Sequence, residues 1–257
     1  MNQSPELIFK ELFSRAKEDS NILGFFLGGS RGKGLSREYS DYDIYIIAKD
    51  IIADSYKTEY PKNKYKGLDL MVYSLSEFKK LYNWGSSEEF GRYSFAHVKV
   101  LVDKIGEIQE ILNETAKVPE NELFKFIPSA LDGYINFFYR SLKCIRDGNI
   151  PAARLEAAYS IPFFLDVVFA IHNGRLRPYY KYLKWEIENF PIKKFPLKAD
   201  ELIDLLMKIL DDADYKTQQR LMKITEIICR EEGFGFQFDS WGDDYMWMMT
   251  FNPKNLK

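Results

Sequence analysis

Residues 25–47, FFLGGSRGKGLSREYSDYDIYII, decide the fold of the first half of this chain. An apolar run ends at a Gly-Gly-Ser turn at residues 28–30, and a polar loop leads to a second apolar run that carries Asp41 and Asp43. Side chains alternate between the two faces of a β-strand, so residues two apart point the same way. The pattern therefore predicts two strands joined by a loop, with both carboxylates on one face of the second strand.

A third acid, Asp69, lies in the later run GLDLMVY at residues 67–73, where apolar residues again alternate. On a neighbouring strand its side chain would stand beside those of Asp41 and Asp43. Clustered carboxylates repel one another and are costly to desolvate unless cations lie between them. Mg²⁺ prefers oxygen ligands and shares its coordination with waters and substrate phosphates. The three acids therefore predict a magnesium site.

Gly29-Ser30, the loop at 31–40, Asp41-x-Asp43 and the later strand acid Asp69 together resemble the signature of the DNA polymerase β-type nucleotidyltransferase superfamily. A catalytic domain followed by a helical domain is also similar to the layout of the antibiotic nucleotidyltransferases, which adenylylate aminoglycosides or lincosamides. The resemblance implies an α+β fold: an N-terminal polymerase β-like domain with a mixed sheet and helices, then a C-terminal all-α helical bundle.

The same resemblance implies roles for the motif residues. Asp41, Asp43 and Asp69 are the expected metal ligands and catalytic residues, and Asp69 is also a candidate to accept the proton of the attacking hydroxyl. Gly29 leaves room for the backbone to approach the β- and γ-phosphates, and Ser30 donates its hydroxyl and amide to them. ATP is the expected nucleotide donor and Mg²⁺ the expected cofactor.

The loop that follows the turn is basic, with Arg31, Lys33 and Arg37. We expect Arg31 to bind the nucleotide and the other two to help attract its triphosphate; the alternative is a solvated basic loop. Arg92, at the end of a segment rich in glycine and serine, is a further candidate for a phosphate or base contact, with ordinary surface as the alternative.

A general base is harder to place, because no motif marks it. Glu156 and Asp166 each interrupt a strongly apolar segment at 151–171, where an uncompensated charge is costly. Glu156 is the candidate base. A pairing with a neighbouring arginine or hydroxyl is the alternative for both acids.

The chain is predicted to divide after residue 117, where Val118-Pro119 interrupts the pattern. The predicted catalytic domain, 1–117, has turn and loop at 28–40, an exposed excursion at 54–66, and strands at 23–27, 41–48, 68–73 and 97–102. The predicted helical substrate-binding domain, 118–257, has helices at about 127–145, 151–171, 179–190, 199–210 and 215–231, with the aromatic tail packed on them.

Composition limits the classes of function. The 257 residues carry a formal net charge of −2 with acids and bases interspersed, so a nucleic-acid partner is possible but not favoured. Two distant cysteines and only two histidines argue against a zinc site and favour a reducing environment. The N-terminus lacks the pattern of a signal peptide and no run is long enough to span a bilayer, so we expect a cytoplasmic protein with no membrane partner.

Three functions remain open at this point. The favoured one is a Mg²⁺-dependent nucleotidyltransferase that moves AMP from ATP to a hydroxyl of a small molecule, such as an aminoglycoside or lincosamide antibiotic, with antibiotic resistance as the expected context. The second is a toxin-type nucleotidyltransferase that acts on tRNA or protein. The third is a non-catalytic, antitoxin-like binding module, against which the presence of the complete motif argues.

Overall fold

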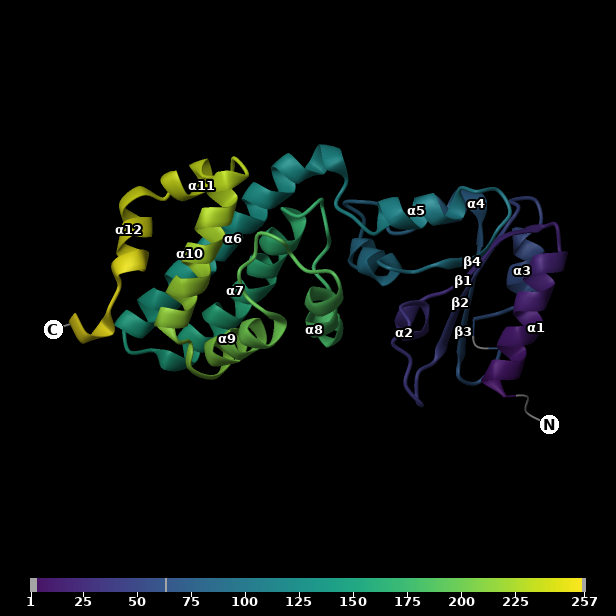
Figure 1. Ribbon diagram of the computed structural model, residues 1–257, viewed down its shortest axis with the longest axis horizontal. Coiled ribbons are helices and arrows are strands. Elements are labelled where there is room, and N and C mark those ends of the chain that lie inside the picture. The colour runs from purple at the N-terminus through teal and green to yellow at the C-terminus, as the bar shows by residue number, and fades with distance from the viewer. Residues whose placement is uncertain (1–3, 63, 256–257) are drawn as a thin grey trace. The chain divides into compact units, whose positions relative to one another are not determined.

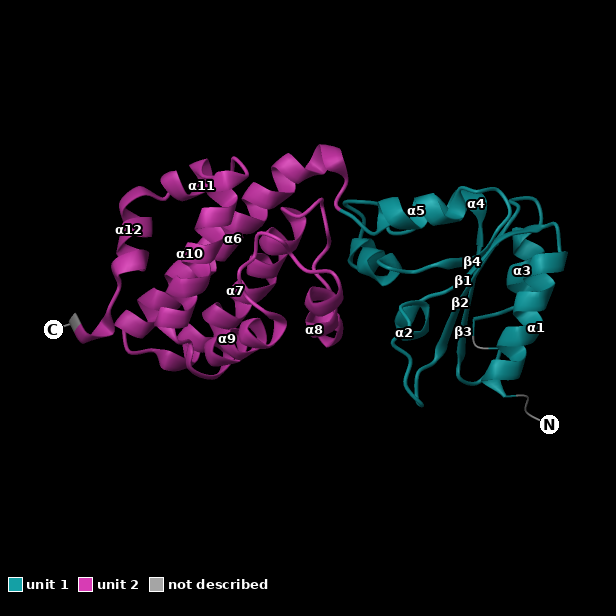
Figure 2. Cartoon of the chain, viewed as in Figure 1, with its two compact units in different colours: residues 1–117 teal, residues 118–257 magenta. Residues whose placement is uncertain are grey.

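The computed structural model describes residues 4–62 and 64–255 (Figure 1). Contacts divide them into two compact units, one that ends at Lys117 and one that begins at Val118 (Figure 2). The first unit combines a β-sheet with helices, and the second is built of helices. The predicted α+β class, with a mixed sheet first and helices after it, is therefore confirmed.

The sheet of the first unit has four strands in the order β3-β2-β1-β4. Strand β1 (Ile22–Leu27) runs antiparallel to β2 (Tyr42–Ala48) and to β4 (Val100–Asp103), whereas β2 runs parallel to β3 (Leu68–Ser74). Because β1 runs opposite to β2 and β3, its end and the beginnings of those two strands meet at one edge of the sheet. The glycine turn and the acids all lie at this edge.

Both faces of the sheet are covered, which explains why its strands are apolar almost throughout. Helices α1 (Pro5–Glu18) and α3 (Ala53–Glu59) lie on one face, as Figure 1 shows, and share a core with Phe25, Ile44 and Ile46. The opposite face is covered by α4 (Leu75–Phe78), the 3-10 helix η1 (Glu89–Phe95) and α5 (Ile108–Thr115), and its core contains Phe26, Tyr45 and Ile47. The predicted alternation of β2 is thus confirmed.

Most of the described residues at 54–66 are exposed, as expected, but the segment is more ordered than an excursion, and residue 63 lies outside the described residues. Helix α3 occupies the first half, and Tyr56 and Tyr60 are buried in the core beneath it. Tyr56 lies within α3 and Tyr60 directly follows its last residue, and both side chains join the same core. Their apolar stripe was hidden in the sequence by the charged residues around it.

Two shorter expectations also need correction. The segment 28–40, expected to be turn and loop, begins with the short helix α2 (Gly29–Gly32). The fourth strand begins at Val100 instead of residue 97. His97 has a φ of 62°, in the left-handed region, which is incompatible with the extended backbone of a strand.

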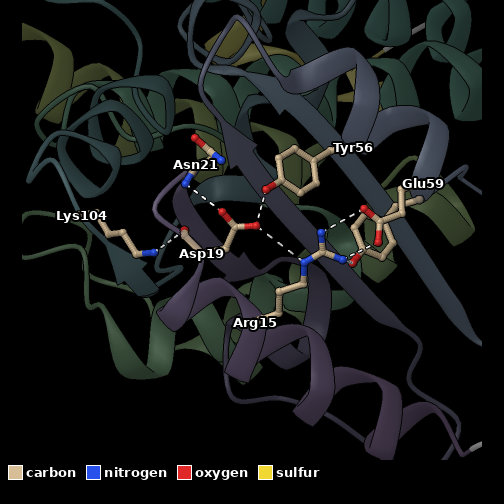
Figure 3. Close-up of polar contacts among 7 residues, drawn as sticks. Arg15, Asp19, Asn21, Tyr56, Glu59 and Lys104 are labelled. Carbon is tan, nitrogen blue, oxygen red and sulfur yellow. Dashed lines mark hydrogen bonds and ion pairs between the residues drawn. The ribbon is translucent and has the colours of Figure 1, made fainter.

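A polar network joins the end of α1 to α3 (Figure 3). The Arg15 guanidinium donates to the Glu59 carboxylate, with 3.0 Å from Nη2 to Oε2, and to the Tyr60 hydroxyl. Asp19 accepts from the Tyr56 hydroxyl and, at 2.9 Å, from the backbone N–H of Asn21. The Arg15 hydrogen bond lowers the pKa of Glu59, and the Tyr56 hydrogen bond lowers that of Asp19. Burial raises the pKa of Tyr60 to about 12.

These shifts predict a stability that falls at both extremes of pH. The lowered pKa values of Asp19 and Glu59 mean that their stabilisation is present above the unfolded values near about 4 and is lost as the pH falls below them. The raised pKa of Tyr60 means that its contribution is lost as the pH rises through about 12. We expect the midpoint of urea unfolding, measured over a series of pH values, to fall at acidic pH and again at alkaline pH.

The variant Arg15→Met should weaken the acidic decline, because it removes the hydrogen-bond donor of Glu59. Arg37→Met, which removes an exposed arginine from the same unit, is the matched control and should keep the full decline. An unchanged acidic decline in Arg15→Met would show that the network does not govern it.

The second unit is organised around the hairpin of α6 (Glu120–Arg146) and α7 (Ile150–Ala170). Helices α9 (Ala199–Asp212) and α10 (Tyr215–Glu231) pack on this hairpin, and α8 (Tyr180–Asn189) packs on α9. Helix α7 is buried around much of its circumference, which explains its apolar sequence. Helix α6 begins earlier than predicted, directly after Pro119.

The aromatic tail packs back on the helices, as predicted. It forms α11 (Phe236–Asp239), α12 (Gly242–Thr250) and the 3-10 turn η2 (Pro253–Asn255). Trp241 Nε1 donates to Asp132 of α6 at 3.0 Å, and the Trp241 and Trp247 rings both meet Tyr139 edge-on.

Within residues 4–62 and 64–255, no helix combines the length and apolar character needed to cross a bilayer.

Candidate active site

Two of the three predicted acids lie directly opposite each other. Asp43 of β2 is the register partner of Asp69 of β3, so the two strands are neighbours as expected. Both acids belong to the face of the sheet that carries Tyr45 and Met71, and neighbouring strands lie about 4.8 Å apart. Asp69 is exposed and Asp43 is half-buried. The two carboxylates therefore start from neighbouring positions on the same face of the sheet.

Asp41 lies at the same edge of the sheet, one residue before β2 begins, and is exposed. A pocket of about 300 Å³ opens beside it and is lined by Asp41, Asp69 and the segment 65–68. Tyr65 and Lys66 of that lining were not predicted. They lie just before Gly67 and the strand of Asp69, so their place in the chain was the available signal.

The glycine turn packs directly against the acids. Gly28 N donates to the carbonyl oxygen of Asp43 at 2.7 Å. Gly29 has a φ of +54°, and a Cβ at this position would lie 1.9 Å from Oδ2 of Asp43. Glycine is therefore favoured here for two reasons: its backbone adopts a positive φ, and the Asp43 carboxylate occupies the place of a Cβ. The sequence carried no signal of the second reason. Ser30 follows in α2, half-buried, and its carbonyl accepts from Leu35 N at 2.7 Å.

In the basic loop, Lys33 does not have the exposed position that was expected of it. This lysine is 8% exposed, and its Nζ donates to the carbonyl oxygens of Ala96 and, at 3.3 Å, Tyr93. It is therefore neither a solvated loop residue nor available to a triphosphate. Arg31 contacts the backbone that carries Asp41, whereas Arg37 is exposed.

Arg92 is also buried, at 6% exposure, which corrects both interpretations of this residue. Its guanidinium donates to the carbonyl oxygens of Tyr82 at 2.8 Å, Glu114 at 3.2 Å and Lys117 at 2.7 Å. Burial lowers the pKa of Arg92, and the three carbonyls offset part of that cost. Arg92 is thus a structural residue that ties η1 to the end of the first unit.

The donor set at the sheet edge suits Mg²⁺ in its chemistry. Among the residues that the structure describes, no three Asp, Glu, His or Cys side chains gather closely enough to hold a metal ion by themselves. Mg²⁺ is, however, commonly held by one or two carboxylates together with waters and substrate phosphates. The carboxylates of Asp43 and Asp69, on facing positions of adjacent strands, are the two ligands that the protein would contribute.

The two acids of the apolar helix α7 are both paired with arginines. Glu156 lies 2.6 Å from Arg140, and Asp166 lies 2.9 Å from Arg177. Burial raises the pKa of Asp166 despite its arginine. The ion-pair alternative thus describes their contacts, and the role of Glu156 as a general base stays a prediction.

Comparisons with known proteins find a likeness among solved structures alone. No family model matches the chain, and no curated protein matches it. Among solved structures, the chain is similar to a nucleotidyltransferase-like protein from Exiguobacterium sibiricum 255-15. The two are 12% identical with a TM-score of 0.41, over 95% of this chain and 79% of that chain.

Proposed function

We propose that this chain is a Mg²⁺-dependent nucleotidyltransferase that moves AMP from ATP to a hydroxyl of a small molecule. One observation carries the proposal. Asp43 and Asp69 face each other on adjacent parallel strands, beside a glycine turn that approaches the Asp43 carboxylate closely. A pair of facing acids next to a turn of small residues is suited to binding a nucleoside triphosphate together with divalent cations.

In this reaction a hydroxyl of the acceptor attacks the α-phosphorus of ATP, the bond to the bridging oxygen breaks, and pyrophosphate leaves. Negative charge develops on the phosphoryl oxygens and on the leaving group, so the protein contributes mainly by positioning and by electrostatic stabilisation. Bound Mg²⁺ ions supply positive charge to the triphosphate and lower the pKa of the attacking hydroxyl.

The acids and the glycine turn at the sheet edge have different proposed roles in this reaction. Asp41 and Asp43 would hold both Mg²⁺ ions, and Asp69 would help to hold the ion that activates the attacking hydroxyl. Asp69, which is exposed and lines the pocket, would accept the hydroxyl proton. Gly29 and Ser30 approach the β- and γ-phosphates through their backbone and the serine hydroxyl.

The proposed acceptor is a small molecule with a free hydroxyl, and the second unit is its proposed binding domain. Aminoglycosides and lincosamides are the acceptors suggested by the resemblance to antibiotic nucleotidyltransferases. Transfer to tRNA or to a protein would use the same chemistry, and a chain without any transfer would be a binding module.

The deciding experiment is a transfer assay with ATP labelled at the α-phosphate. We expect label to appear on a small molecule when the full-length chain is incubated with Mg²⁺ and a panel of hydroxylated antibiotics. Parallel reactions contain a tRNA pool or the chain alone, and a chelator serves as the control. Label on tRNA or on protein would change the acceptor class, and no transfer to any acceptor would contradict the proposal.

A further inference from the structure

Arg31 reaches from α2 back to the segment that carries the acids. Its Nε donates to the carbonyl oxygens of Ser40 and Asp41, both at 3.1 Å, and its Nη2 donates to that of Ser40 at 2.8 Å. The guanidinium carbon lies 3.8 Å from the ring centre of Tyr42. One planar group thus holds the carbonyls on both sides of the Asp41 α-carbon and covers the ring of the next residue.

Asp41 is the acid that depends most on such support. Asp43 and Asp69 are held by the pairing of β2 with β3, whereas Asp41 precedes the first residue of β2. The loop before it, residues 36–39, is exposed. Hydrogen bonds from Arg31 therefore supply for Asp41 part of the order that strand pairing supplies for the other two acids.

The same arginine belongs to the glycine turn, because it follows Gly29 and Ser30 directly in α2. A second link between the turn and the strand is the 2.7 Å hydrogen bond from Gly28 N to the carbonyl of Asp43. The turn and the acids are thus joined at two points, by the backbone at Asp43 and by the Arg31 side chain at Asp41.

We propose that Arg31 is a positioning residue for the metal site and not a ligand of the nucleotide. It holds the backbone of Asp41 at a set place relative to the glycine turn, so that Asp41 can add its carboxylate to the metal share of Asp43 and Asp69. This inference rests on the proposed function. Lysine cannot replace arginine in this role, since a single ammonium lacks the planar fork that spans two carbonyls and stacks on a ring.

The test separates positioning from phosphate binding in the full-length chain. The affinity for Mn²⁺, followed by electron paramagnetic resonance, and the affinity for ATP without metal, followed by calorimetry, are measured for wild type, Arg31→Lys and Arg31→Gln. We expect both variants to bind Mn²⁺ about 10- to 100-fold more weakly, as when other supports of metal ligands are removed. Their metal-free affinity for ATP should equal that of wild type.

Lys79→Gln is the matched control, because it removes a positive charge from the same unit at an exposed pair with Glu107, 2.9 Å away. It should bind Mn²⁺ as wild type does. Hydrogen exchange at the amides of residues 40–42 adds a readout that needs neither metal nor turnover, and it should be faster in both Arg31 variants.

Three outcomes would overturn the inference. Mn²⁺ affinity equal to that of wild type in both variants would do so and leave the proposed function intact. Metal-free ATP affinity that falls in Arg31→Gln and returns in Arg31→Lys would make Arg31 a phosphate ligand. A wild-type chain that binds no Mn²⁺, with or without ATP, would overturn both this inference and the metal dependence of the proposed function.

Discussion

Asp43→Asn is expected to lower the rate of nucleotidyl transfer by about 10²- to 10³-fold, because the proposed transition state depends on charge held at this position. Asparagine has nearly the same shape but removes the negative charge that faces Asp69 across the β2–β3 pair. The fold should persist, since the hydrogen bond between Gly28 and Asp43 is made by the backbone. Relief of the repulsion between two facing carboxylates should even favour folding slightly.

Initial rates of label transfer and the thermal midpoint together check this expectation. Asp54→Asn is the matched control: it makes the same substitution at a carboxylate whose side chain is 97% exposed, paired with Lys57 at 3.2 Å. The control should keep the full rate. Undiminished transfer by Asp43→Asn would remove this residue from the mechanism, and a collapse of the thermal midpoint would indicate a structural role instead.

Gly29→Ala has the second large expected effect, on both stability and activity. A side chain at a φ of +54° costs about 1–2 kcal/mol. The new Cβ would also lie 1.9 Å from the Asp43 carboxylate, so that the turn or the acid must shift. Because a displacement of about 1 Å in a reacting group can cost about 10²-fold in rate, we expect a comparable loss of transfer.

A second glycine in the same loop separates strain from displacement. Gly34 also has a positive φ, +71°, but a Cβ there would meet nothing within 4 Å. Gly34→Ala should therefore lose about as much stability from strain alone while keeping its activity. The two variants are compared by thermal midpoint and transfer rate. Equal rates for both would show that the contact between Gly29 and Asp43 does not matter for the reaction.

Much of the sheet could be predicted from the sequence because its signals are local. Apolar and polar residues alternate around Asp43 and Asp69, and this pattern placed both acids on the face of the sheet that the structure shows. Every second side chain of a strand points to the same face, so the position of a residue along the strand fixes its direction. The start of α1 is equally local, because the Ser4 side chain accepts from Leu7 N and Pro5 occupies the first helical position.

The errors share a different cause. Arg92 and Lys33 were taken as surface cations, but both are buried on backbone carbonyls. The carbonyl of Lys117 that Arg92 meets lies 25 residues away in the chain. A backbone acceptor carries no sequence signature, so no pattern around either cation could have revealed it.

The sequence by itself determined the class of fold and the shared face of Asp43 and Asp69, because strand parity acts over a few residues. Only the tertiary structure decided which cations face solvent, that Asp43 meets Asp69 in register, and that Gly29 touches the Asp43 carboxylate. It also showed that Arg31 donates hydrogen bonds to the backbone carbonyls of Ser40 and Asp41. These contacts join segments separated by loops, and their partners are settled by packing and burial of the whole unit.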